Sequence, residues 1–320
     1  MKIGVLTVPL YQMELKDALA YLKGLGVEAV ELGTGGFSGN THCDPEKLLS
    51  DRDALARFRE TIAESGLEIS GFSCHGNPVH PIGEIARRAH REYLRTLELA
   101  EEMGVDRVVT FSGCPGDSPG SRCPNWVTCP WPEDYSRLLA YQWEEVLIPY
   151  WREAAGLAAR AGVKVCLEMH PGFCVYNPET LLKLRAAAGE EICANVDPSH
   201  LFWQGIDPVL AIRRLGDAVQ YVHVKDVRVD PFNRAENGVL DTKEYGRFQS
   251  RSWTFRTVGY GHDACTWSNI VSELRMAGFD GVLSIEHEDG LLSVREGLEK
   301  AVAFTKSVAV GAPAAEMWWA

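Results

Sequence analysis

Short runs of β-branched and apolar residues alternate eight times with longer amphipathic segments along this chain of 320 residues. Each short run is followed by a segment with the period of a helix. The predicted strands cover residues 2–8, 28–33, 68–74, 107–112, 164–169, 192–197, 219–225 and 281–287. Glycine, which commonly ends a helix in the left-handed conformation, follows several of the predicted helices: Gly26, Gly66, Gly104, Gly162 and Gly278.

This alternation predicts a parallel sheet whose outer face is covered by helices. Eight such units in a chain of this length favour a closed (β/α)8 TIM barrel, with a doubly wound open sheet as the alternative. No shift in composition divides the chain. We therefore expect one barrel domain over residues 1–310 and a C-terminal tail over 311–320, whose paired tryptophans dock on the barrel or on a neighbouring subunit.

Two connections are longer than the loops that usually follow barrel strands. The first, residues 113–135 after the fourth strand, is rich in Pro, Gly and Trp. The second, roughly 228–262 after the seventh strand, carries five arginines. In a TIM barrel both lie on the face where the strands end, so we expect them to cover the mouth and to set substrate choice.

Composition limits the partners that the chain can bind. A formal net charge of −12 disfavours nucleic acid and anionic membrane surfaces, which are bound by clustered Lys and Arg. The sequence contains no run of 18 apolar residues, so no membrane span is predicted. Nine cysteines without a C-x-x-C pair indicate reduced thiols, and therefore a cytoplasmic protein. A small-molecule partner is expected, and a homo-oligomer is left open.

Titratable side chains stand at the carboxyl ends of four consecutive predicted strands, where barrel enzymes place their catalytic groups. They are Glu168 in LEMHPG, Asp197 in CANVDPSHLF, His223 in YVHVKD and Glu286 in SIEHED. Three carboxylates and one imidazole form a mostly hard ligand set, which suits one divalent ion, Mn²⁺ first and Mg²⁺ or Co²⁺ as alternatives. Such an ion can polarise a carbonyl and stabilise an adjacent enediolate oxygen.

Each of these residues also has a simpler interpretation. An acid at a strand end is commonly a helix N-cap or an ion-pair partner, and Asp197 before Pro198 has the pattern of an N-cap followed by the first helical residue. Four such residues on adjacent strands are harder to explain in this way. We therefore expect Asp197 to bind metal and His200, three residues later, to face the substrate.

The ordered set of Glu168, D-x-x-H at 197–200, H-V-K-D at 223–226 and Glu286 resembles the xylose-isomerase-like TIM-barrel family of sugar isomerases and epimerases. Ketose 3-epimerases, inosose dehydratases and keto-glycoside-processing enzymes are its close branches. The resemblance implies that Glu168 and Glu286 both bind the metal and exchange protons on opposite faces of the substrate carbon. It implies a divalent-metal-dependent isomerase or epimerase acting on a keto-sugar or a sugar derivative.

Several other residues near the predicted mouth are candidates for substrate contacts. The epimerase branch has a substrate-binding Arg six residues beyond the seventh-strand His, where this chain has Val229, with Arg228 one residue earlier. Lys225 and Asp226 are alternatives for that polar contact. The full set of predicted substrate-binding residues is His200, His75, His170, Arg228, Lys225 and Trp126. Each of them could instead order a loop or pack against it.

Three other functions compete with this prediction. A lyase that dehydrates an inosose or cleaves a 3-keto-glycoside begins with the same proton removal beside a ketone, so motifs do not separate it from an epimerase. A DNA-repair endonuclease of the endonuclease IV type shares the barrel but needs a trinuclear zinc site with further histidines, and the fourth strand here ends in VVTFSG. A non-catalytic binding subunit would be suggested by a lost ligand, and all four are present.

Overall fold

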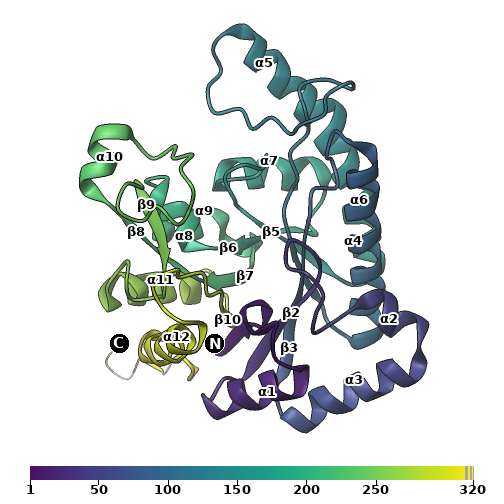
Figure 1. The fold of residues 1–320 in the computed structure, drawn as a ribbon, viewed down its shortest axis with the longest axis vertical. Coiled ribbons are helices and arrows are strands. Elements are labelled where there is room, and N and C mark those ends of the chain that lie inside the picture. Colours follow the sequence, from purple (N-terminus) through teal and green to yellow (C-terminus); the bar gives the residue numbers. More distant parts are fainter. Residues whose placement is uncertain (314–315, 318, 320) are drawn as a thin grey trace.

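A computed structural model describes residues 1–313, 316–317 and 319 of the chain. Eight parallel strands close into a barrel in the order β1, β10, β7, β6, β5, β4, β3, β2, which confirms the predicted (β/α)8 fold (Figure 1). These strands are β1 (Lys2–Leu6), β2 (Ala29–Gly36), β3 (Glu68–His75), β4 (Arg107–Thr110), β5 (Lys164–Glu168), β6 (Ile192–Val196), β7 (Val219–Val224) and β10 (Val282–Ile285). All eight overlap the strands expected from the sequence.

Helices cover the outside of the barrel, and the left-handed glycines Gly66 and Gly104 end two of them with φ of 63° and 70°. Their apolar faces pack on the strands in one continuous core. The helices of the outer layer are α1 (Leu15–Gly24), α2 (Pro45–Ser50), α3 (Arg52–Ser65), α4 (Gly83–Met103), α6 (Ile148–Arg160), α7 (Pro178–Ala188), α9 (Pro208–Leu215), α11 (Ala264–Met276) and α12 (Val294–Val308). Short 3₁₀ turns cover Val8–Leu10 and Gly216–Ala218.

The interior of the barrel has an apolar floor below a polar mouth. The floor is a buried cluster of four side chains, Val109, Cys166, Cys193 and Tyr221. Side chains two residues apart on a strand point to the same face. Two positions further along β5, β6 and β7, Glu168, Asn195 and His223 therefore point the same way as the floor residues, and all three are buried. The period of the strands thus places polar groups at the mouth.

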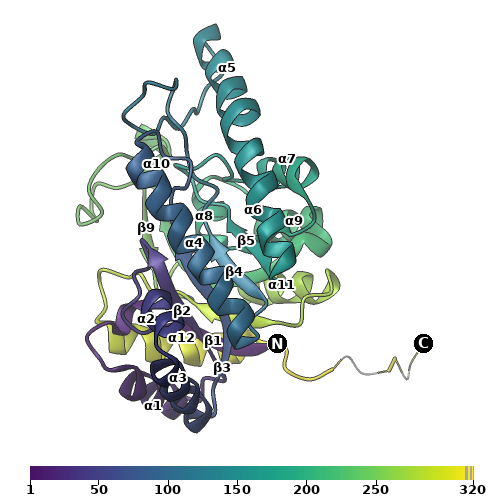
Figure 2. The ribbon, with the colours of Figure 1, turned by 90° about the vertical axis from the view of Figure 1, so that its right-hand side faces the viewer.

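The long connection after β4 leads into a helix that projects beyond the barrel. Helix α5 (Glu133–Ala140), a π-helix over Tyr141–Leu147 and α6 follow one another without a break, and Figure 2 shows α5 extending past the barrel. The buried amide of Gln142 donates to the carbonyls of Pro115, Gly116 and Asn125 at 3.1, 3.3 and 2.7 Å. These bonds fix the irregular part of the connection against the helix.

The long connection after β7 contains a hairpin that the sequence did not predict. Strands β8 (Asp226–Val229) and β9 (Trp253–Arg256) pair antiparallel, with α10 (Pro231–Asn237) between them in the chain. The hairpin packs on α8 (Pro198–Trp203), since the rings of Trp203 and Trp253 stack with centroids 4.6 Å apart. A second, two-stranded sheet therefore stands over the end of β6.

The predicted boundary between the barrel and a C-terminal tail at residue 310 stays a prediction. Of the paired tryptophans expected to dock, Trp318 lies outside the described residues. The amino-terminal nitrogen of Met1 donates to the carbonyl of Val310 at 2.9 Å, so the chain is still attached to the barrel at that point. Within the described part of the chain, every helix is too short or too polar to cross a bilayer.

Candidate active site

The four residues expected to bind a metal converge at the mouth of the barrel. One potential ligand atom from each of Glu168, Asp197, His223 and Glu286 lies within 4.8 Å of the others. The Nδ1 atom of His223 is 3.2 Å from a Glu168 oxygen and 3.1 Å from a Glu286 oxygen. Because β5, β6, β7 and β10 are adjacent in the barrel, their carboxyl ends bring these side chains together. We call these four residues the ligand cluster.

The two carboxylate oxygens of Asp197 correspond to the two roles considered for this residue, a helix N-cap and a metal ligand. Its Oδ1 accepts a hydrogen bond from the backbone of Ser199 at 2.8 Å and so caps α8. Its Oδ2 is buried and accepts no well-aligned hydrogen bond among the described residues, although Nε2 of His200 lies 3.3 Å from it and the ammonium of Lys225 3.9 Å from it. A buried carboxylate oxygen that accepts no aligned hydrogen bond is costly, so Oδ2 is the atom available to a ligand.

Glu31, which was not predicted as a site residue, fixes the orientation of His223. Both of its carboxylate oxygens lie 3.1 Å from Nε2 of His223, which leaves Nδ1 facing the ligand cluster. Glu31 is fully buried and also accepts hydrogen bonds from the hydroxyls of Ser73 and, at 2.6 Å, Ser284. A carboxylate behind a ligating histidine is the usual support for a metal site. The signal was a lone acid inside the apolar run AVEL.

The ligand cluster concentrates negative charge away from water. Burial, together with repulsion from Glu168 and Glu286, raises the pKa of Asp197 to about 6. Burial alone would also raise the pKa of Glu168 and Glu286, but the neighbouring histidines and Lys225 hold both below their usual values. Two carboxylates thus stay ionised, and a bound cation would lower the raised pKa of the third. A divalent ion fits this donor set.

Lys225 supplies a buried positive charge at the edge of the cluster. Its ammonium lies 2.6 Å from Glu288, 3.3 Å from Glu286 and 3.9 Å from Asp197. Burial alone would lower the pKa of Lys225, but these carboxylates raise it well above its usual value. The ring of Phe255 covers the ammonium at 4.3 Å. Lys225 is therefore a fixed hydrogen-bond donor at the mouth.

His75 connects Glu168 to the loop after β2. Its Nε2 lies 3.2 Å from a Glu168 oxygen, and its Nδ1 lies 2.7 Å from the hydroxyl of Ser38. The ring of Phe111 packs on His75 with centroids 4.5 Å apart. This places His75 at the mouth, as expected, with its Nε2 on a predicted metal ligand. No role for Ser38 was predicted from the sequence.

His170 and His200 lie side by side on the other side of Glu168. The Nε2 of His200 is 3.1 Å from Glu168 and 3.3 Å from Asp197, and the two imidazole rings are 4.0 Å apart. Nδ1 of His170 donates to the carbonyl of Pro171 at 2.6 Å. Burial and the neighbouring His200 lower the pKa of His170 to about 3, so its ring is neutral. Glu168, His170 and His200 form a second group with potential ligand atoms within 4.8 Å.

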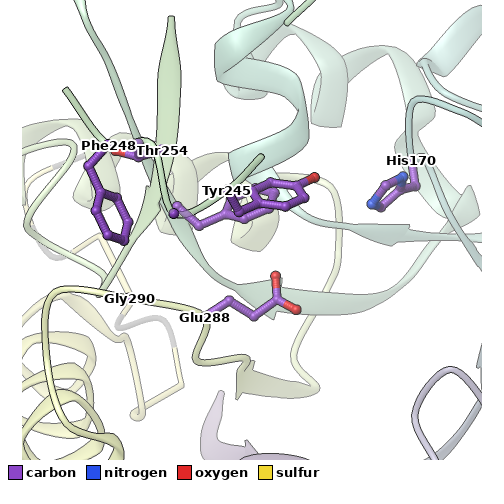
Figure 3. Close-up of a pocket in the computed structure, with 8 residues that line it drawn as sticks. His170, Tyr245, Phe248, Thr254, Glu288 and Gly290 are labelled. Carbon is purple, nitrogen blue, oxygen red and sulfur yellow. The ribbon is translucent and has the colours of Figure 1, made fainter. Parts of the chain in front are cut away.

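Three cavities adjoin at the mouth, and His170 lines all of them. The inner cavity, of about 140 Å³, is bordered by Glu168, Glu286, Lys225 and His75. A cavity of about 360 Å³ lies beside His200 and is lined by side chains from both long connections, among them Trp126, Leu240 and Trp253. A third cavity of about 450 Å³ is shown in Figure 3. Both connections thus contribute walls at the mouth.

The structure does not bring all the predicted substrate contacts to the ligand cluster. Trp126 lines the 360 Å³ cavity and packs edge-on against Tyr176. Arg228 is exposed, because β8 turns Val227 toward Trp203 and Arg228 to the opposite face of the hairpin. The buried Asp226 instead accepts hydrogen bonds from the backbone of Gly259, Gly261 and His262 at 2.9 to 3.1 Å. That carboxylate anchors a loop.

A closed barrel with carboxylates and histidines at its strand ends defines a TIM-barrel protein with a candidate metal centre. The chain belongs to the xylose isomerase-like TIM barrel family, whose model matches residues 19–308. This confirms the resemblance seen in the motifs.

Among known proteins, the chain is 38% identical over 306 residues to the uncharacterized protein YfiH of Bacillus subtilis (strain 168), covering 94% of this chain and 97% of that one. It is 31% identical over 106 residues to an inosose dehydratase of Geobacillus kaustophilus (strain HTA426), covering 33% and 34%. The structure of a D-psicose 3-epimerase superposes with a TM-score of 0.63 at 14% identity, covering 98% of this chain and all of that one. The last likeness shows a shared fold.

Proposed function

We propose that this protein is a divalent-metal-dependent isomerase or epimerase that moves a proton beside the carbonyl of a keto-sugar or sugar derivative. The observation that carries the proposal is the convergence of Glu168, Asp197, His223 and Glu286 within 4.8 Å. Family membership supports an enzyme of carbohydrate chemistry. All nine cysteines are free, which fits the cytoplasmic location that we also propose.

The ligand cluster would hold the ion, with Mn²⁺ as the first candidate. The Asp197 oxygen that accepts no aligned hydrogen bond and the buried carboxylates of the cluster both favour a bound cation. Near the cluster, Lys225 is one permanent positive charge against the carboxylates of Glu31, Glu168, Asp197 and Glu286. When bound, a divalent ion would polarise the substrate carbonyl and stabilise the negative charge that develops as a proton leaves the neighbouring carbon.

The protein's own residues would then carry the proton. Glu168 ends β5 and Glu286 follows β10, and one carboxylate oxygen of each lies within 3.2 Å of the Nδ1 atom of His223. Each would exchange a proton with a substrate carbon held beside it. His75 and Ser38 give Glu168 a hydrogen-bonded route toward the loop after β2. Proton transfer by such positioned groups is typically worth about 10²- to 10⁴-fold in rate.

Three other side chains at the mouth would orient the substrate. Lys225 keeps its charge and can donate a hydrogen bond to a substrate oxygen. The Nδ1 atom of His200 has no hydrogen-bond partner among the described residues, whereas its Nε2 lies 3.1 Å from Glu168, and His170 keeps a neutral ring beside it. An unpaired buried ring nitrogen of this kind suits a sugar hydroxyl.

A lyase that acts on an inosose or a 3-keto-glycoside is the second candidate. The similarity to an inosose dehydratase over 106 residues favours it specifically. Such a reaction would begin with the same proton removal and would then expel a group from the next carbon. An endonuclease is a remote alternative, because β4 runs into Phe111 and Ser112 rather than into a further histidine and the net charge is −12.

The test is an incubation of the Mn²⁺-loaded protein in D₂O with a panel of keto-sugars, inososes and 3-keto-glycosides. Deuterium incorporation beside the carbonyl is followed by mass spectrometry, and the products are identified by NMR. Incorporation without loss of a substituent would support the epimerase, and elimination would select the lyase. Absence of both, in protein shown to contain the metal, would contradict proton-transfer catalysis.

A further inference from the structure

The 450 Å³ cavity beside the ligand cluster has walls that come mainly from the connection after β7. Its rings and small residues are Tyr245, Phe248, Phe255, Thr254, Gly246 and Gly290. His170 and Glu288 line this outer cavity and the inner cavity alike, so the two adjoin. Figure 3 shows the ring of Tyr245 between Phe248 and His170, with the Glu288 carboxylate beneath it. A molecule larger than one sugar ring can therefore extend from one cavity into the other.

Aromatic faces dominate the outer cavity. The rings of Tyr245 and Phe255 stack with centroids 5.8 Å apart and planes 18° from parallel. Phe255 also covers the ammonium of Lys225, so this wall begins at the ligand cluster. Phe248 packs against Gly290, where an added Cβ would lie 2.6 Å from its ring. Tyr245 is 57% exposed, so its ring is accessible to a ligand in this cavity.

Polar groups gather at one end of this cavity only. Glu288 and His170 stand at its inner edge, where it meets the inner cavity, and Glu288 already pairs with Lys225 at 2.6 Å. Elsewhere, among the described residues that line it, the hydroxyls of Tyr245 and Thr254 are the remaining polar side-chain groups. A second sugar would bury several hydroxyls there without partners, which is costly. A phosphate would find no cationic side chain among these lining residues. A planar apolar ring meets neither difficulty.

We propose that the substrate is the keto form of an aryl glycoside. Its sugar ring occupies the inner cavity beside the ligand cluster, and its aromatic aglycone lies among Tyr245, Phe248 and Phe255 in the outer cavity. This inference rests on the proposed function and narrows its substrate class from keto-sugars in general to glycosides with an aromatic aglycone.

The test measures binding without turnover. Isothermal titration calorimetry compares paired phenyl and methyl β-glycosides of glucose, galactose and xylose on the Mn²⁺-loaded protein. We expect the phenyl member of at least one pair to bind about ten-fold more tightly, because stacking and burial of one ring are worth that factor. Tyr245→Ala and Phe248→Ala should each remove most of the preference, whereas Tyr245→Phe should keep it. Tyr135→Ala and Phe232→Ala, which truncate exposed rings elsewhere, are the matched controls.

Equal affinity within all three pairs would overturn the inference. So would a phenyl preference that survives in both Tyr245→Ala and Phe248→Ala at unchanged melting temperature. The D₂O experiment keeps the two proposals distinguishable. Deuterium exchange in simple keto-sugars without a phenyl preference removes the aryl glycoside and leaves the proposed function standing. A phenyl preference that depends on Tyr245, without exchange in any keto compound, leaves the binding site and removes the proposed reaction.

Discussion

The ligand cluster and the outer cavity adjoin, yet the chain builds them in different ways. The cluster stands at the ends of hydrogen-bonded barrel strands, and its residues Glu168, Asp197 and His223 are at most 2% exposed. The outer cavity is formed by a hairpin and loop whose Tyr245 is 57% exposed. Ligand geometry is therefore fixed by the barrel, while the wall depends on packing between side chains of one connection. Chemistry and substrate choice thus have separate structural supports.

The largest expected effect is on turnover after a change in the ligand cluster. Glu286→Gln keeps the size of the side chain but removes the base and one charge, so turnover should fall by about 10³-fold or more. Mn²⁺ affinity should fall as well. Steady-state kinetics and metal analysis on the same preparation would check both. Glu60→Gln, at an exposed position on α3, is the matched control and should behave as the unmodified protein.

Two substitutions at the start of α8 separate metal binding from substrate binding. Asp197→Asn keeps a good N-cap but removes a ligand charge, so Mn²⁺ occupancy should fall with little change in the melting temperature of the metal-free protein. His200→Ala should retain the ion and lower turnover by about 10²-fold. Asp197→Ala should also lose the cap, about 1 kcal/mol of stability. Equal loss of metal in the Asn and His200 variants would end this division of roles.

A change at Glu31 tests whether the carboxylate behind His223 contributes to metal binding by the ligand cluster. Glu31→Gln leaves a hydrogen-bond partner for His223 but removes the charge, and should weaken Mn²⁺ binding by about 10- to 100-fold. Titration of the metal-free protein with Mn²⁺ would measure this. An affinity unchanged within about two-fold would mean that His223 needs no carboxylate behind it.

A change in the outer wall should spare the cluster. The buried guanidinium of Arg251 donates to the carbonyl of Trp253 at 3.1 Å and stacks on Tyr245 at 4.5 Å. Arg251→Lys should loosen this packing, cost about 1–3 kcal/mol of stability and reduce binding of phenyl glycosides. Mn²⁺ affinity should stay the same. Arg228→Lys, on the exposed face of the hairpin, is the control. Metal loss in Arg251→Lys would contradict the independence of the two regions.

The two regions also differ in how far the sequence predicts them. The eight strands follow from local periodicity, and Glu168 and Glu286 follow from their positions at the carboxyl ends of their strands. Glu31 was missed because its importance depends on which way β2 faces and on contacts with His223, which lies far away in the chain. The hairpin of β8 and β9 was missed because its strands pair across a long intervening segment. Non-local pairing leaves little trace in local periodicity.

The central claim is that one divalent ion binds at the ligand cluster. It is tested most directly by electron paramagnetic resonance during titration of the metal-free protein with Mn²⁺, since free and bound ions give different signals. We predict one tight site per chain, lost or greatly weakened in His223→Ala and retained in Glu60→Gln. A protein that binds no Mn²⁺ tightly, or one that binds it equally well in His223→Ala, would contradict this account.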